Sequence, residues 1–137
     1  MNGNNIFNII DLILKNITLH KNEIEELDQS IGDGDHIFNL LRGLKEASLL
    51  RNSLANENID IIFKQIGLKM MITIGGSSGA LFSTLLINMA KNFNELFSFS
   101  KNLSHMFYHG VKAMKDRGKA EIGDKTMLDV LSPVSQK

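Results

Sequence analysis

Apolar residues recur at intervals of three and four along most of this chain, and this spacing is the feature that most constrains its fold. The clearest stretches lie within 6–17, 59–74 and 103–114. Such spacing gathers apolar side chains on one face of an α-helix. Strand signals are weak, because no Asn-Gly or Asp-Gly pair stands between alternating runs of β-branched residues. The sequence therefore predicts an all-α bundle.

The remaining helices are predicted from shorter patterns. The segment 81–97 is apolar on much of its circumference, which is typical of a helix at the centre of a fold. The polar stretch 51–58 is expected to be a loop. The other predicted elements are a short helix or helical extension at 23–27, a helix whose buried stripe is Phe38, Leu41, Leu44 and Ala47, and a last helix from Lys125 to about Leu131 with Asp124 as its N-cap.

Bulk properties bound the class of protein. The 137 residues are expected to form one domain, 1–137, and the formal net charge of zero gives no general attraction to nucleic acid or to an anionic membrane. No apolar run reaches the roughly eighteen residues that a membrane span requires, and no basic start precedes an apolar core. Cysteine is absent. These observations lead us to expect a cytoplasmic protein with neither nucleic acid nor membrane as a partner.

Three carboxylates are concentrated in one glycine-containing turn. Asp28, Asp33 and Asp35 fall within eight residues, and Gly32 and Gly34 allow a tight backbone path that can turn the carboxylates toward one another. Carboxylates that converge repel one another unless a cation neutralises them. Their hard oxygen atoms favour magnesium or calcium over zinc. The turn therefore predicts a metal site, and an exposed turn followed by a helix cap is the alternative.

The spacing excludes an EF-hand calcium loop. Counted from Asp28 or Asp33, the twelfth residue is Asn39 or Leu44, whereas that loop requires glutamate. His36 and Asn39 are three residues apart and share a helical face beside the carboxylates. They either contact a phosphate or nucleotide, or are ordinary residues of a helix start.

A second loop, 75–79, reads Gly-Gly-Ser-Ser-Gly between two apolar helices. A helix N-terminus carries free N–H groups and partial positive charge, so Ser77 and Ser78 stand where an anion can bind. No Gly-Lys-Ser/Thr closes a Walker A motif, and no strand precedes the loop as a Rossmann fingerprint requires. The alternative is a turn between helices with a serine cap.

A third segment, 117–129, is polar and then helical. Lys119 and Lys125 offer charge to phosphates, and Gly118 and Met127 are suited to line a flat ring. The alternative is a C-terminal glycine cap, a solvated loop and a capped helix.

Together the three segments resemble the ADP-binding L subunit of bacterial dihydroxyacetone kinase and the matching domain of the ATP-dependent enzymes. The resemblance spans about Leu27 to Pro133. It rests on Ile-Gly-Asp-x-Asp-His-x-x-Asn, Gly-Gly-x-Ser-Gly-x-Leu and Arg-Gly-Lys-Ala-x-x-Gly-Asp-Lys-Thr-Met-x-Asp, in that order. It implies an antiparallel helical barrel with a nucleotide at one end. The chain matches the N-terminal two-thirds of that domain, so we expect a barrel incomplete at the C-terminus, with core faces such as the side of Met127, Leu128 and Leu131 exposed.

The resemblance also implies roles for single residues. Asp28, Asp33 and Asp35 correspond to the ligands of two magnesium ions that bridge the phosphates. The expected nucleotide contacts are His36 and Asn39, then Ser77 and Ser78 at the phosphates, then Gly118 and Met127 around the adenine. No catalytic base is expected in this chain.

The implied function is that of a kinase subunit, a phosphotransferase that holds ADP or ATP. In the phosphotransferase-system branch an M subunit supplies the phosphoryl group, which passes through the nucleotide to dihydroxyacetone on a K subunit. Exposed core faces also predict self-association or poor stability. Two alternatives remain: a non-catalytic interaction module, and a related kinase with another acceptor such as a fatty acid.

Overall fold

In a computed structural model that describes residues 3–136, the chain is all-α, as predicted, and these residues contain no strand. The predicted domain limits at residues 1 and 137 lie outside the described residues. No helix within 3–136 is both long enough and apolar enough to cross a bilayer. The helices are α1 (Gly3–Leu19), α2 (Lys21–Gln29), α3 (His36–Leu49), α4 (Arg51–Leu54), α5 (Ile59–Thr73), α6 (Gly76–Lys91), α7 (Phe99–Gly118) and α8 (Leu128–Ser135).

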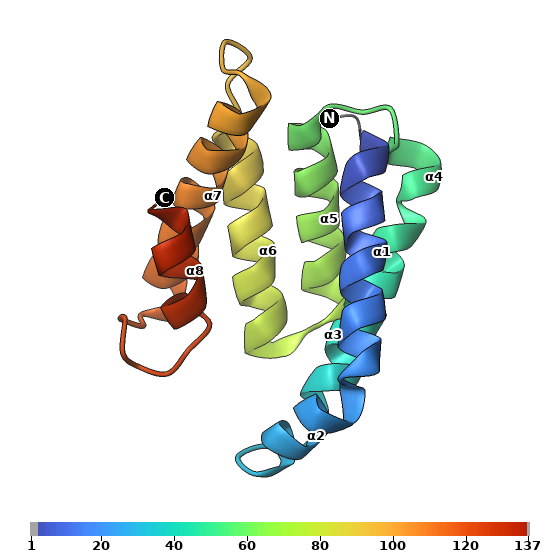
Figure 1. Ribbon diagram of the computed structural model, residues 1–137, viewed down its shortest axis with the longest axis vertical. Coiled ribbons are helices and arrows are strands. Elements are labelled where there is room, and N and C mark those ends of the chain that lie inside the picture. The colour runs from blue at the N-terminus through green and yellow to red at the C-terminus, as the bar shows by residue number, and fades with distance from the viewer. Residues whose placement is uncertain (1–2, 137) are drawn as a thin grey trace.

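Six of the helices form an open antiparallel row. Its order is α1, α3, α5, α6, α7 and α8, and each helix packs against the next (Figure 1). α1 and α8 stand at opposite ends and do not meet, so the row curves without closing into a barrel. Because the directions alternate, the α2–α3 turn, the α5–α6 turn and the α7–α8 turn all lie at one end of the molecule. The three segments singled out in the sequence therefore share that end.

Two apolar clusters hold the row together. The first core joins α1, α3 and α5 around Phe7, Ile62 and Ile66, and the second joins α6, α7 and α8 around Met106 and Met114. Phe63, Phe82 and other partly buried side chains pack against both clusters. The apolar stripes predicted within 6–17 and 59–74 supply most of the first core, because α1 and α5 each present one apolar face.

Several predicted boundaries were wrong. Residues 51–54 form the short helix α4 instead of a loop, and α6 ends at Lys91 instead of continuing to residue 97. The buried side chain of Asn102 explains the second difference. Its Oδ1 accepts a hydrogen bond from Asn94 N at 2.9 Å, and its Nδ2 donates to Asn94 O at 2.7 Å. These bonds fix a turn after α6. Continuation of the helix would break them.

The buried face of α3 also differs from the prediction by one residue. Phe38 is 47% exposed, whereas its neighbour Ile37 is fully buried with Leu41, Leu44 and Ala47. Lys21 Nζ lies 4.4 Å from the centre of the Phe38 ring, which covers part of that ring on the outer surface. Both residues are apolar, so the direction from which α1 and α5 approach α3 decides which of them is buried.

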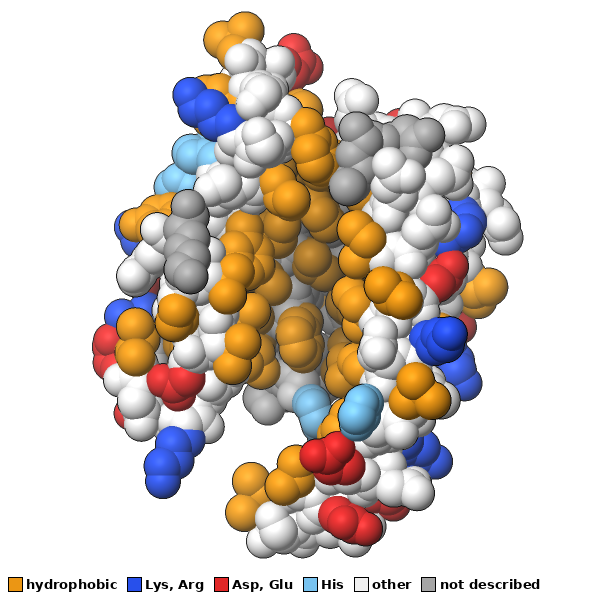
Figure 2. Space-filling view, viewed as in Figure 1, with side chains coloured by type: hydrophobic (Ala, Val, Ile, Leu, Met, Phe, Trp, Pro, Cys, Tyr) orange, Lys and Arg blue, Asp and Glu red, His pale blue; other side chains and the backbone are white. Residues whose placement is uncertain are grey.

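The apolar surface left open is not the one expected at the C-terminal end. Leu128 is only 3% exposed, and Met127 and Leu131 pack against the second core, because α8 folds back onto α7. An apolar groove of about 410 Å³ opens instead inside the curve of the row. Only Ile, Leu, Phe and Met side chains from α1, α3, α5, α6 and α7 line it, and Figure 2 shows it as a hydrophobic hollow.

Candidate functional site

The carboxylate loop connects the end of α2 to the start of α3 and is shaped by Gly34. This glycine is buried with φ +77°, and a Cβ atom there would lie 2.8 Å from Gln29 Cγ. A side chain at this position would therefore meet both backbone strain and a steric clash. The turn that Gly34 allows brings Asp33 and Asp35 back beside Asp28 at the end of α2.

The three aspartates converge as the sequence predicts. Asp28, Asp33 and Asp35 each offer one carboxylate oxygen, and these oxygens lie within 4.8 Å of one another. Backbone amides and one side chain orient them. Asp28 Oδ2 accepts a bond from His36 N at 3.2 Å, and Asp35 Oδ2 accepts one from Asn39 Nδ2 at 2.9 Å. Three converging carboxylates are a donor set that fits a hard divalent cation such as Mg²⁺.

The start of α6 faces this loop. The chain turns through Gly75 and Gly76, and the first backbone hydrogen bond at the start of the helix runs from Gly79 N to Gly75 O at 2.9 Å. The N–H groups of residues 76–78 therefore precede the regular hydrogen bonding of the helix. Ser77 is exposed and Ser78 is half-buried. Free N–H groups, two hydroxyls and the positive end of a helix dipole suit an anion such as a phosphate.

A cleft of about 300 Å³ joins the two loops. Its walls are Asp28, Asp35, His36, Asn39, Ile74 and residues 75–78. Ser78 Oγ and His36 Nδ1 share a hydrogen bond of 3.3 Å across it. Six of the nine predicted site residues therefore line one cleft. Asp33 belongs to the carboxylate cluster but does not line this cleft.

The two residues predicted around an adenine are not brought into this cleft. Gly118 ends α7 as an exposed residue, and a Cβ atom there would lie 3.3 Å from Leu81 of α6. Met127 is half-buried against the second core. The loop between them is the α7–α8 turn, which lies at the same end of the molecule as the cleft (Figure 1).

This loop is organised by Asp129, which the sequence reading did not single out. The Asp129 carboxylate accepts bonds from Gly123 N at 2.6 Å and from Thr126 N at 3.0 Å. These bonds, with Gly123 as the larger cause, lower the pKa of Asp129. Thr126 Oγ1 accepts a bond from Leu128 N at 3.2 Å, in the manner of a capping box. The Thr-x-x-Asp pattern is the signal that could have found it.

The N-cap assigned to Asp124 was therefore wrong. Its Oδ2 accepts a bond from Glu121 N at 2.8 Å within the loop, and α8 begins at Leu128. Asp129 already satisfies the free N–H groups ahead of α8, so Asp124 is left to close the preceding turn.

Comparison with a protein-family model matches residues 30–137 to the DAK2 domain. Among curated proteins, the chain is similar to the ADP-binding subunit of PEP-dependent dihydroxyacetone kinase 1 of Listeria innocua, with 36% identity over 84% of this chain and 58% of the relative. It is similar to the corresponding ADP-binding subunit of Escherichia coli, with 39% identity over 79% of this chain and 52% of the relative. The chain thus spans somewhat more than half the length of these relatives.

A solved structure is similar over nearly the whole chain. The dihydroxyacetone kinase of Citrobacter freundii, in complex with AMP-PNP and Mg²⁺, superposes with a TM-score of 0.80 at 27% identity. The match covers 95% of this chain and 24% of that enzyme.

Proposed function

The chain belongs to the DAK2 domain family, and from this premise we propose that it is the nucleotide-binding part of a dihydroxyacetone kinase. The observation that carries the proposal is the cleft in which the carboxylate cluster faces the N-terminus of α6. Such a cleft offers negative charge to a metal ion and N–H donors to phosphates. The relatives named as ADP-binding subunits, and a similar structure solved with AMP-PNP and Mg²⁺, support the same reading.

We assign the metal ions to the carboxylate loop. Asp28, Asp33 and Asp35 would hold magnesium, with two ions expected, and bound magnesium supplies positive charge that neutralises phosphate oxygens. Asn39 holds the carboxylate of Asp35 through its hydrogen bond. In phosphoryl transfer the chain would then position the phosphates and neutralise their charge.

The nucleotide contacts follow from the two sides of the cleft. Ser77 and Ser78, with the free N–H groups of α6, would bind the phosphates, while His36 and Asn39 contact the nucleotide from the start of α3. His36 also orients the hydroxyl of Ser78. For Gly118 and Met127 the proposed adenine contacts rest on the family resemblance and on their place at the same end of the molecule.

The remaining parts of the reaction belong to other chains. We propose that a phosphoryl-donor M subunit recharges bound ADP to ATP, and that the phosphoryl group passes to dihydroxyacetone held on a K subunit. The names of the relatives as subunits of PEP-dependent kinases support these partners. No base that acts on the triose is assigned to this chain. We propose a cytoplasmic location.

One observation favours a second function. The apolar groove inside the curve of the row fits a non-catalytic interaction module. Phosphoryl transfer to dihydroxyacetone by the purified chain with its K and M partners would contradict this alternative.

Isothermal titration calorimetry with ADP tests the nucleotide site. We expect binding in the presence of Mg²⁺ that weakens when EDTA removes the metal. Absence of ADP binding at millimolar Mg²⁺, in a chain shown to be folded by circular dichroism, would contradict the proposed function.

A further inference from the structure

Arg42 on α3 connects the two loops of the cleft through a relay of hydrogen bonds. Its Nη2 donates to Asn39 Oδ1 at 2.8 Å, and its Nε donates to the backbone oxygen of Thr73 at 2.8 Å. Asn39 Nδ2 in turn donates to Asp35 Oδ2 at 2.9 Å. The relay therefore runs from the last residue of α5 to the carboxylate cluster.

We propose that Arg42 is a positioning residue that orients Asn39, and through it Asp35, in the magnesium site. This proposal rests on the proposed function. The amide of asparagine has one acceptor end and one donor end, whereas the guanidinium of arginine has only donors. Arg42 can therefore bind only Oδ1 of Asn39, and this choice turns Nδ2 toward the carboxylate of Asp35. A residue in place of Arg42 that can also accept a hydrogen bond would allow the flipped amide of Asn39. The flipped amide presents its oxygen to the Asp35 carboxylate, which it repels.

The other end of the relay fixes the phosphate loop. Thr73 is the last residue of α5, so its carbonyl lies at the negative end of the helix dipole and among the carbonyls that lack a partner in the helix. The chain turns through Gly75 and Gly76 immediately afterwards. A cation that binds this carbonyl therefore holds α3 at a fixed place relative to the start of α6.

Gly43 permits this approach. A Cβ atom built on Gly43 would overlap Ile74 Cγ1, and Ile74 is buried at the wall of the cleft. The missing side chain lets α3 lie close to the end of α5, which brings the adjacent Arg42 within reach of Thr73. Arg42 forms no ion pair with a carboxylate of residues 3–136. Within residues 3–136, its side-chain hydrogen bonds are therefore these two oriented bonds.

The test measures ADP affinity by calorimetry over a range of Mg²⁺ concentrations, which gives the apparent Mg²⁺ affinity separately from metal-free ADP binding. We expect Arg42→Gln to lower the apparent Mg²⁺ affinity by about 10- to 100-fold, the usual effect of losing a partner that orients a metal ligand. Metal-free ADP binding should change much less. Arg42→Lys should lie between wild type and Arg42→Gln, because an ammonium still selects Oδ1 but is a single point donor.

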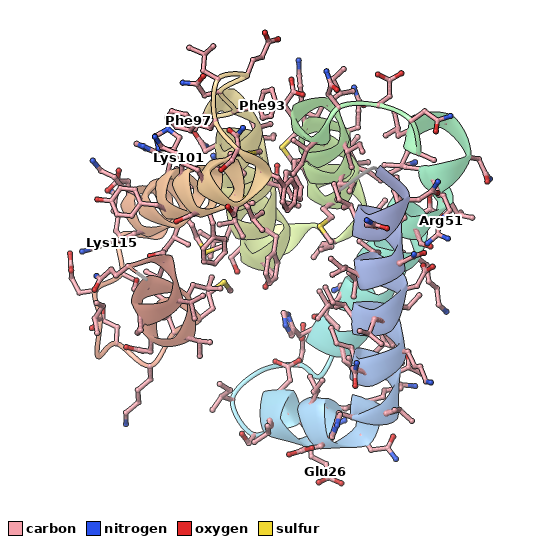
Figure 3. All side chains as sticks on the ribbon, turned by 45° about the horizontal axis from the view of Figure 1, so that its top comes forward. Glu26, Arg51, Phe93, Phe97, Lys101 and Lys115 are labelled. Carbon is pink, nitrogen blue, oxygen red and sulfur yellow. The ribbon has the colours of Figure 1, made fainter. Side chains whose placement is uncertain are left out.

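Arg51→Gln is the matched control. Arg51 lies on the outer side of the molecule, where it pairs with Asp11 and is remote from the α2–α3 loop (Figure 3). Its substitution removes the same charge and should leave the Mg²⁺ dependence unchanged.

The outcomes separate the two proposals. A folded wild-type chain without Mg²⁺-dependent ADP binding would overturn the proposed function and this inference together. If wild type shows Mg²⁺-dependent ADP binding and Arg42→Gln has the same Mg²⁺ affinity as wild type, only the role of Arg42 would be overturned. If Arg42→Gln does not fold, Arg42→Lys decides, and a Mg²⁺ affinity equal to wild type would then contradict the proposal.

Discussion

His36 Nδ1 and Ser78 Oγ lie 3.3 Å apart, although 42 positions separate the two residues in the chain. Their hydrogen bond joins the first turn of α3 to the first turn of α6. The carboxylate loop precedes one of these turns and the glycine-serine loop leads into the other. The bond therefore fixes the distance between the proposed metal side and the proposed phosphate side of the cleft.

This relationship predicts coupled effects of the two residues on nucleotide binding. Ser78→Ala should weaken ADP binding in the presence of Mg²⁺ by about fivefold to tenfold, because a hydrogen bond of about 1 kcal/mol is lost together with a phosphate contact. His36→Ala should weaken it as well, and the double variant should cost less than the sum of the two. Calorimetry on the four proteins measures this coupling. If the losses in ADP-binding free energy of the two single variants simply add up in the double variant, a coupling through this hydrogen bond would be contradicted.

Gly43→Ala should destabilise the fold. In an open helix position this change stabilises by up to about 1 kcal/mol, but here the new methyl group overlaps Ile74 and forces α3 away from α5. We expect a loss of about 1–3 kcal/mol in the free energy of unfolding, measured by urea denaturation. Lys45→Ala, on an exposed position of the same helix, is the control and should change stability little. A stabilised Gly43→Ala variant would contradict the close approach of Gly43 to Ile74.

The bonds from Gly123 and Thr126 that lower the pKa of Asp129 predict a dependence of stability on pH. Because the folded state favours the ionised carboxylate, this stabilisation is present at neutral pH and is lost as the pH falls below the ordinary carboxyl pKa. Asp129→Asn should lower the melting temperature at pH 7. The fall in melting temperature from pH 7 to pH 3 should be smaller in this variant than in wild type. Melting curves at both pH values measure this. The same drop in both proteins would contradict a structural role for the ionised carboxylate.

The apolar groove predicts self-association of this chain. Ile13 lines the groove and is 42% exposed, so Ile13→Glu places a charge where a second molecule would bury apolar surface. The adjacent Leu12 is 58% exposed but does not line the groove, which makes Leu12→Glu the control. We expect sedimentation velocity to show concentration-dependent association that Ile13→Glu reduces and Leu12→Glu retains. Self-association through the groove would be contradicted by a wild-type chain that stays monomeric up to about 100 μM. That concentration is well above the micromolar range of weak complexes.

Local sequence signals predicted much of the fold. The period of three and four along 6–17 and 59–74 identified α1 and α5, because each buries a single face. The glycine-containing turns identified the two loops of the cleft. Burial of Ile37 instead of Phe38 could not be predicted, since the two residues are adjacent and equally apolar and only the approach of neighbouring helices distinguishes them.

Features that depend on tertiary structure were out of reach of the sequence. Arg42 meets Thr73 because α3 packs against the end of α5, and the two residues are 31 positions apart. Neither residue belongs to a recognisable motif. The groove likewise arises from the curvature of the whole row of helices. The end of α6 depends on Asn102, a residue of the following helix that bonds back to Asn94.

Asp33→Asn tests most directly whether the carboxylate cluster holds the magnesium through which the chain binds a nucleotide. Calorimetric titration with ADP, with and without Mg²⁺, compares this variant with wild type and with Glu26→Gln. Glu26 lies on α2 and is exposed, so its substitution removes an equivalent charge outside the cluster (Figure 3). We expect Mg²⁺ to strengthen ADP binding by wild type and Glu26→Gln, and this gain to fall at least about tenfold in Asp33→Asn. An unchanged gain in Asp33→Asn would contradict a magnesium site at the carboxylate cluster.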